Sequence, residues 1–169
     1  NNRIRKISTS GNVTTLAGGS LGSNDGVGTS AQFYYPVGVT VDTSGNVYVA
    51  DLSNHRIRKI TPSGVVSTFA GSGFGYSDGV GTSAQFNNPN GVTIDLNGNV
   101  YVSDGGNHRI RKITPSGVVS TVAGSGNAGF LDGNGISSQF NWPSAINMDS
   151  SGNIYVSDSG NYRIRKIFP

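Results

Sequence analysis

The chain has 169 residues, of which 26 are glycine and only 12% are charged, a composition typical of turn-rich β structure. It has no cysteine, which excludes disulfides and thiolate metal sites, and no apolar run approaches the roughly 20 residues that a membrane-spanning helix needs. The net charge of +3 arises because a basic phrase with three positive charges occurs four times, whereas the nine aspartates form three sets of three. Each full repeat is therefore neutral, and we expect neither a nucleic-acid partner nor a membrane partner.

The basic phrase opens the chain and then recurs along it. NNRIRKI occupies residues 1–7, NHRIRKITPSGVVST occurs letter for letter at residues 54–68 and 107–121, and NYRIRKIFP ends the chain. Other landmarks recur after 53 and then 54 residues, as from Asp25 to Asp78 to Asp132. We therefore divide the single domain 1–169 into repeats at about 1–53, 54–106 and 107–160, with a partial fourth copy at 161–169. A period of this length predicts a solenoid, a propeller or an array.

Each repeat contains four short segments with strand character, which we call strands a to d. Within one period they span residues 91–95, 100–104, 108–113 and 118–123, and tight turns such as LNGN and TPSG separate them. Such short turns make neighbouring strands antiparallel and adjacent. The sequence therefore predicts an all-β chain built from the four-stranded antiparallel blades of a β-propeller.

The stretch GVTVDTSGNVYVADLSNHRIRKI, residues 38–60, resembles an NHL repeat, which is named after an Asn-His pair such as Asn54–His55. The resemblance covers essentially the whole chain, with Asn2 and Tyr162 departing from it at the histidine position. It implies a propeller fold. Some propellers of this resemblance are lyases or lactonases that hold a metal at the central channel with histidine or carboxylate clusters on inner strands.

Catalytic clusters of that kind are not predicted in this chain. Strand a carries only Asp42, Asp95 and Asp149, each at the end of a strand, and the chain has no glutamate. We expect these aspartates to bond local backbone N–H groups in D-x-x-G-N turns. We expect no enzymatic activity, no cofactor and no metal site; part of a lyase-like or lactonase-like propeller is the alternative.

In strand letters the chain reads c-d, a-b-c-d, a-b-c-d, a-b-c, which amounts to about three blades with split terminal blades. The two ends are complementary, so we expect a homo-oligomer in which the N-terminal strands of one chain complete the C-terminal blade of another. Two chains would give a six-bladed ring, and a joint that does not close would give a head-to-tail filament. A segment of a longer propeller polypeptide is the third possibility.

The repeated charges are expected to be structural. Arginine and lysine stems can cover apolar surface between blades and leave their charge at the rim, and the repeated aspartates are candidate partners. Asp25, Asp78 and Asp132 begin the Gly-rich segments DGVG, DGVG and DGNG, and the Asp or the following Thr is expected to cap a short helical turn. The residues assigned to blade structure and assembly are Arg3, Arg5, Arg56, Arg58, Arg109, Arg111, Arg163, Arg165, Asp51, Asp104 and Asp158.

One end of each blade carries the b–c turn and the long d–a linker, where the repeats differ most in aromatic residues. Variable aromatic residues on long loops are where a binding surface is expected. This makes a carbohydrate- or protein-binding module the alternative to a purely self-assembling scaffold, and the composition favours an extracellular or cell-surface protein. The candidate binding residues are Tyr34, Tyr35, Phe74, Tyr76, Phe130 and Trp142.

Overall fold

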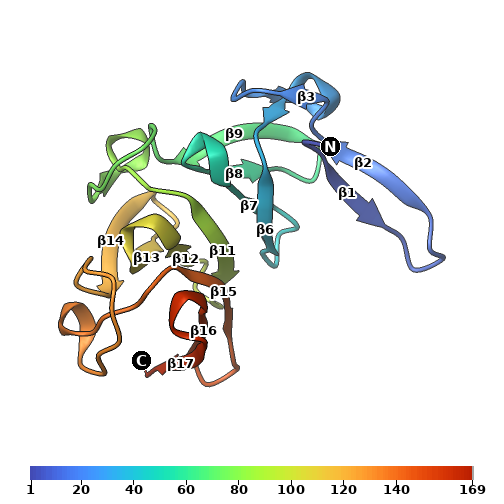
Figure 1. Cartoon of the computed structure of the whole chain (residues 1–169). Helices are drawn as coiled ribbons and strands as arrows, with labels where there is room; N and C mark the ends of the chain where they lie inside the picture. The colour runs from blue at the N-terminus through green and yellow to red at the C-terminus, as the bar shows by residue number, and fades with distance from the viewer. Residues whose placement is uncertain (169) are drawn as a thin grey trace.

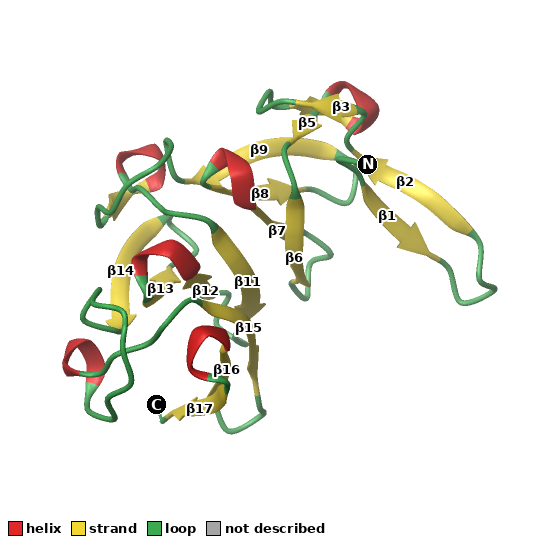
Figure 2. Ribbon diagram, viewed as in Figure 1, coloured by secondary structure: helices red, strands yellow, loops and turns green. Residues whose placement is uncertain are grey.

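The computed structural model describes residues 1–168 and shows short antiparallel strands in successive sheets that are arranged as an arc (Figures 1 and 2). The N-terminal hairpin lies at one end of the arc and the C-terminal strands lie at the other (Figure 1). The hairpin consists of β1 (Ile4–Ile7) and β2 (Val13–Ala17), which are strands c and d. We call this hairpin the N-terminal half-blade.

Three further sheets follow as the first, second and third blades. The first contains β6 (Pro36–Val41), β7 (Val47–Asp51), β8 (Arg56–Ile60) and β9 (Val65–Ala70). The second contains β11 (Pro89–Ile94), β12 (Val100–Asp104), β13 (Arg109–Ile113) and β14 (Val118–Ala123). The third contains β15 (Pro143–Met148), β16 (Ile154–Asp158) and β17 (Arg163–Ile167). The predicted order c-d, a-b-c-d, a-b-c-d, a-b-c is therefore present.

The complete blades contain a fifth short strand that the sequence did not predict. β4 (Gly26–Val27) pairs antiparallel with β9, and β10 (Gly79–Val80) pairs with β14 in the same way. These residues belong to the d–a linker, which therefore runs along the outer edge of the blade before it reaches strand a. The linker also contains β3 (Ser20–Leu21), which pairs parallel with β5 (Gln32–Phe33).

Turn chemistry fixes the strand ends. The Oδ1 atom of Asp42 accepts hydrogen bonds from the backbone N–H groups of Ser44 at 2.9 Å and Asn46 at 2.8 Å, so it closes the a–b turn as predicted. Asp95 and Asp149 do the same in the next blades. Each b–c turn is one turn of 3-10 helix, namely Leu52–Asn54, Gly105–Asn107 and Ser159–Asn161.

The apolar core lies between the blades, with one cluster at each joint. At the joint of the first and second blades, Ala50 and Ile57 pack against Phe86, Val100 and neighbouring residues. Equivalent clusters lie on either side of it, around Phe33 and around Phe140. Because these clusters take residues from both blades that meet at a joint, a single blade cannot form this core alone. Among residues 1–168, no helix is long and apolar enough to cross a membrane.

Candidate functional site

A buried arginine lies at the centre of each of the three blades. Arg58, on β8, is fully buried, and its guanidinium binds Asp51 Oδ2 at 2.8 Å and Asp25 Oδ1 at 2.6 Å. It also donates to the carbonyl oxygens of Gln32 at 2.9 Å and Asn24 at 3.1 Å. The charge of this arginine is thus neutralised inside the blade. The expectation from the sequence that it lies at the rim is wrong for this residue.

The same arrangement occurs in the other two blades. Arg111 binds Asp104 and Asp78, and Arg165 binds Asp158 and Asp132. Asp25, Asp78 and Asp132 therefore anchor the d–a linker to strand c. The expectation that this loop caps a helical turn is wrong, because the 3-10 turn at Gly28–Ser30 has no side-chain cap.

The inner aspartate of each ion pair also closes the b–c turn. Asp51 is buried and accepts hydrogen bonds from the Asn54 side chain at 2.8 Å and from the Tyr34 N–H at 2.8 Å. Burial raises the pKa of the Asp51 carboxyl, and the bonds from Asn54, Tyr34 and Arg58 oppose that rise. Asp104 and Asp158 accept the equivalent three hydrogen bonds in the next two blades.

An outer arginine of strand c stacks on an aromatic side chain of the linker. The Arg109 guanidinium carbon lies 3.8 Å from the ring centroid of Tyr76, and that of Arg163 lies 4.0 Å from the ring centroid of Phe130. The Tyr76 hydroxyl also lies 3.0 Å from Thr121 Oγ1. Two of the six candidate binding aromatics are therefore held by cation–π stacking, with about half of each side chain still exposed.

A side-chain latch joins consecutive blades at the end that carries the b–c turns. His55 Nδ1 accepts the N–H of Asn88 in the next blade at 3.1 Å, and His108 Nδ1 accepts the N–H of Trp142 at 3.0 Å. Asn2 Oδ1 accepts the N–H of Tyr35 at 3.2 Å in the same way. Burial lowers the pKa of both histidines, which favours the neutral ring that can accept a hydrogen bond.

The remaining candidate aromatics lie beside these latches. Phe74 packs edge-on against His55 with ring centroids 5.5 Å apart, and Trp142 packs against His108 at 6.4 Å. Tyr34 lies next to Tyr35, whose backbone joins the latch at Asn2. The structure thus distributes the six aromatics over successive joints and loops. We call this aromatic-bearing end of the blades the loop end.

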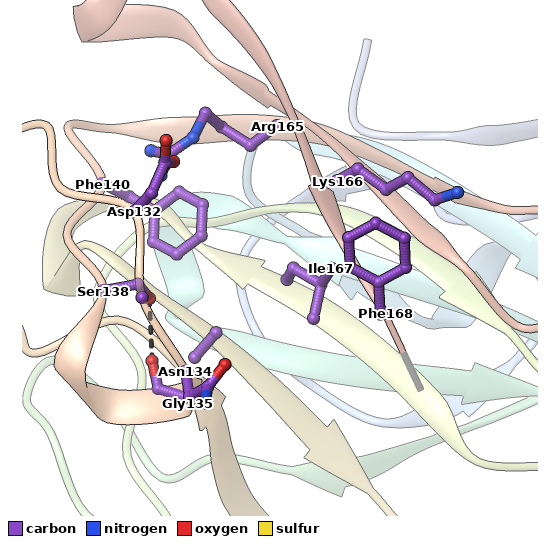
Figure 3. Close-up of a pocket in the computed structure, with 11 residues that line it drawn as sticks. Asp132, Asn134, Gly135, Ser138, Phe140, Arg165, Lys166, Ile167 and Phe168 are labelled. Carbon is purple, nitrogen blue, oxygen red and sulfur yellow. Dashed lines mark hydrogen bonds and ion pairs between the residues drawn. The ribbon is translucent and has the colours of Figure 1, made fainter.

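A cavity of about 450 Å³ lies beside β17 in the third blade (Figure 3). Its lining includes Asp132, Phe140, Arg165, Ile167 and Phe168. The equivalent space in the second blade is filled by β14, which pairs with both β13 and β10. The cavity is therefore the position of strand d, bounded by the free edge of β17.

The filled blades show which contacts strand d makes in this position. In the first blade, Thr68 on β9 donates its N–H to Asp25 at 3.2 Å and its hydroxyl to the same carboxylate at 3.2 Å. In the second blade, Thr121 donates its hydroxyl to Asp78 at 3.3 Å. Among residues 1–168, the corresponding Asp132 binds Arg165 alone, and its side chain is 82% exposed, against 51% for Asp25.

The NHL repeat model matches residues 33–60, 86–113 and 140–167, which run from strand β5 or its equivalent to strand c of each blade. The chain belongs to the NHL-repeat family. It is 41% identical over 98 residues to NHL repeat-containing protein 2 of Bos taurus, a match that covers 54% of this chain and 13% of that protein. The fold is that of an NHL β-propeller, as the sequence predicted.

Two solved structures are similar over almost the whole NHL chain. A structural genomics protein of unknown function from Bacteroides thetaiotaomicron has a TM-score of 0.82 and 31% identity and covers 98% of this chain. An auxiliary nutrient binding protein from Bacteroides ovatus has a TM-score of 0.79 and 25% identity over 99% of this chain. The chain spans only 42% and 43% of those two proteins.

Proposed function

We propose that this NHL chain is a non-enzymatic scaffold that assembles head to tail by completing blades between copies and presents its loop end for binding. The observation that carries the proposal is the open strand position in the third blade, because the first two blades hold a strand there. In the assembled state, the N-terminal half-blade of one copy supplies strands c and d to β15 and β16 of another.

Arg5 supports this pairing. It occupies the position of Arg58, Arg111 and Arg165, each of which binds two aspartates. Arg5 is exposed, and among the described residues its side chain contacts only the Thr14 carbonyl oxygen, at 3.4 Å. A half-blade that replaced β17 would bring Arg5 to Asp158 and Asp132 of the other copy and would restore the buried ion pairs.

The mass of the chain in solution tests the proposal. By light scattering after size exclusion, we expect twice the 17.5 kDa of one chain for a ring, or larger species for a filament. Arg5→Ala should shift the protein toward monomer, since it removes the partner of two carboxylates in the joint. Ser10→Ala is the matched control, because Ser10 lies in the turn of the same half-blade and, among the described residues, its side chain forms a hydrogen bond only with Ser8 Oγ. A monomer at every concentration would contradict the proposal.

The absence of catalysis is part of the same proposal. It is supported by the bonds of the aspartates, which accept backbone N–H groups in the a–b turns or pair with the central arginines. These structural roles account for the positions of the carboxylates without a catalytic role. Screening the chain with and without divalent cations against lactone and streptogramin substrates tests it. Turnover that survives repurification and is lost on substitution of an aspartate would overturn this part.

A second candidate function is the binding of a carbohydrate or a protein at the loop end. The partly exposed rings of Tyr34, Tyr35 and Trp142 favour it, as does the similarity to a nutrient binding protein. A glycan array followed by titration tests it, with Tyr34→Ala as the variant. Val80→Ala, at an exposed residue of the outer edge strand, is the control that should bind unchanged.

A further inference from the structure

The inner strands of neighbouring blades, β6, β11 and β15, pack backbone against backbone. A Cβ atom at Gly91 on β11 would lie 2.5 Å from the Ser144 carbonyl oxygen and 2.9 Å from the Ile146 nitrogen on β15. A Cβ atom at Gly38 on β6 would meet the Asn90 carbonyl oxygen of β11 in the same way. Both internal joints therefore require a residue without a side chain at this position.

The third blade carries Ala145 at the equivalent position. Counting from the proline that begins each inner strand, Gly38, Gly91 and Ala145 are all the third residue. Ala145 is exposed, on the side of β15 that faces away from the second blade. Its methyl group therefore occupies the space into which a further inner strand would have to fit.

The rest of this face keeps the residues that make the internal joints. Tyr155 corresponds to Tyr48, which is 5% exposed within a joint, whereas Tyr155 is 38% exposed. Ser157 corresponds to Ser103, whose hydroxyl donates across the joint to the Ser144 carbonyl oxygen. We call the face formed by Ala145, Tyr155 and Ser157 the docking face of the third blade. It differs from the equivalent face of the second blade at this inner-strand position by one added methyl group.

The complementary face lies on the first blade. Val37, Val39 and Val41 on β6 are exposed, because the N-terminal half-blade has no strands a and b to cover them. Val39 corresponds to Val92 and Ile146, which are only 6% and 8% exposed at the internal joints. At the internal joints, the equivalent faces of the first and second blades contact Val92 and Ile146. The β6 strand of a second copy therefore offers the third blade the same kind of apolar surface.

We propose that the docking face of the third blade binds the β6 face of a second copy, and that the Ala145 methyl group makes this joint weaker than the two internal ones. The inference rests on the proposed head-to-tail assembly and adds the residue that sets its strength. The carbonyl of Val37 in the second copy takes the place of the Asn90 and Ser144 carbonyls. It must lie farther from β15 than those carbonyls lie from the glycines, because the Ala145 methyl group occupies the space between. The assembly is consequently reversible, while each chain remains folded.

Sedimentation velocity over a concentration series tests the role of Ala145. Ala145→Gly should lower the dissociation constant at least about tenfold, which corresponds to about 1.4 kcal/mol and to the lower range of overpacking penalties. Ala145→Val should raise it, since two more methyl groups enter the same space. Val39→Lys on the opposing face should abolish association in every background, and because Val39 is exposed the fold should persist.

An internal substitution serves as the matched control. Gly91→Ala introduces the same methyl group at the joint of the second and third blades, so it should lower the melting temperature by more than Ala145→Gly does, since that change costs only the backbone entropy of a glycine in an exposed strand. Equal dissociation constants for the wild type and Ala145→Gly overturn the inference, as does association that survives Val39→Lys. In either case a loss of association in Arg5→Ala would leave the proposed blade completion standing, so the two failures are distinguishable.

Discussion

His55 and His108 connect protonation to the packing of the blades. Each accepts a backbone N–H of the following blade through Nδ1, and burial holds the pKa of both rings below the ordinary value. The unfolded chain binds a proton near pH 6.5, whereas the folded chain does so only at lower pH. The stability that these latches contribute is therefore present above about pH 6.5 and is lost as the pH falls toward the lowered folded-state pKa values.

The chain itself supplies a variant that removes this titration. Asn2 makes the same latch with an amide oxygen that does not titrate in this range. Replacing both histidines by asparagine should preserve stability at pH 7.5 and remove a loss of about 1 kcal/mol per latch on acidification to pH 5. Urea denaturation at the two pH values measures this. If the wild type and the double variant lose the same stability, the latches are not the acid-sensitive groups.

At the scale of elements, the sequence predicted the strands well where side chains alternate. Strands b and d of the second blade match the predicted residues 100–104 and 118–123. Strand c begins one residue later than predicted because His108 adopts a left-handed conformation with φ of 55°. Strand a begins earlier, at Pro89, because its pairing continues past an irregularity in register.

The features that the sequence did not predict depend on residues far apart in the chain. The fifth strand is two residues long, too short for an alternating pattern, and β10 is defined by its pairing with β14 about forty residues later. The Asp25–Arg58 pair spans 33 positions, so local reasoning assigned Asp25 to a helix cap. Of the candidate site, the sequence identified the aromatic loops but not the histidine latches, whose acceptor atoms face a backbone group in the next blade.

The open position beside β17 should take a strand in trans. A peptide of residues 64–71, which carries strand d of the first blade, is expected to bind saturably at this position. Its Thr68 can reach Asp132, as Thr68 reaches Asp25 in the first blade. Asp132→Asn should weaken binding, and a peptide with proline in place of Thr68, which lacks the N–H, should not bind. Fluorescence anisotropy of the labelled peptide measures both. Equal affinity for the two peptides would show that the bound peptide does not repeat the contact between the Thr68 N–H and Asp25 seen in the first blade.

At the scale of the whole molecule, the central arginines of the three blades form buried ion pairs. Arg58, Arg111 and Arg165 each lie between two carboxylates, and two of the outer arginines stack on aromatic rings. The three central arginines therefore add little to any exposed basic surface. Paired charges of this kind provide little of the counterion release that drives nucleic-acid binding.

We accordingly expect no retention of double-stranded DNA or RNA at about 150 mM salt, where the Debye length is about 8 Å. An electrophoretic mobility shift at increasing protein concentration measures this. Repeating the assay at low salt serves as a positive control for weak, non-specific attraction. A complex that persists at the higher salt would mean that the exposed arginines act together as a binding surface.

The identical Ile-Arg-Lys-Ile sequences of β1 and β17 have a kinetic consequence for any joint between copies. The edge of β16 cannot distinguish an incoming β1 from the resident β17 by sequence, so one can replace the other residue by residue, as one strand displaces another in a DNA duplex. At no stage must the whole edge be bare. Exchange of partners would then proceed without unfolding of the blade, and protein concentration would decide which of the two strands holds the edge.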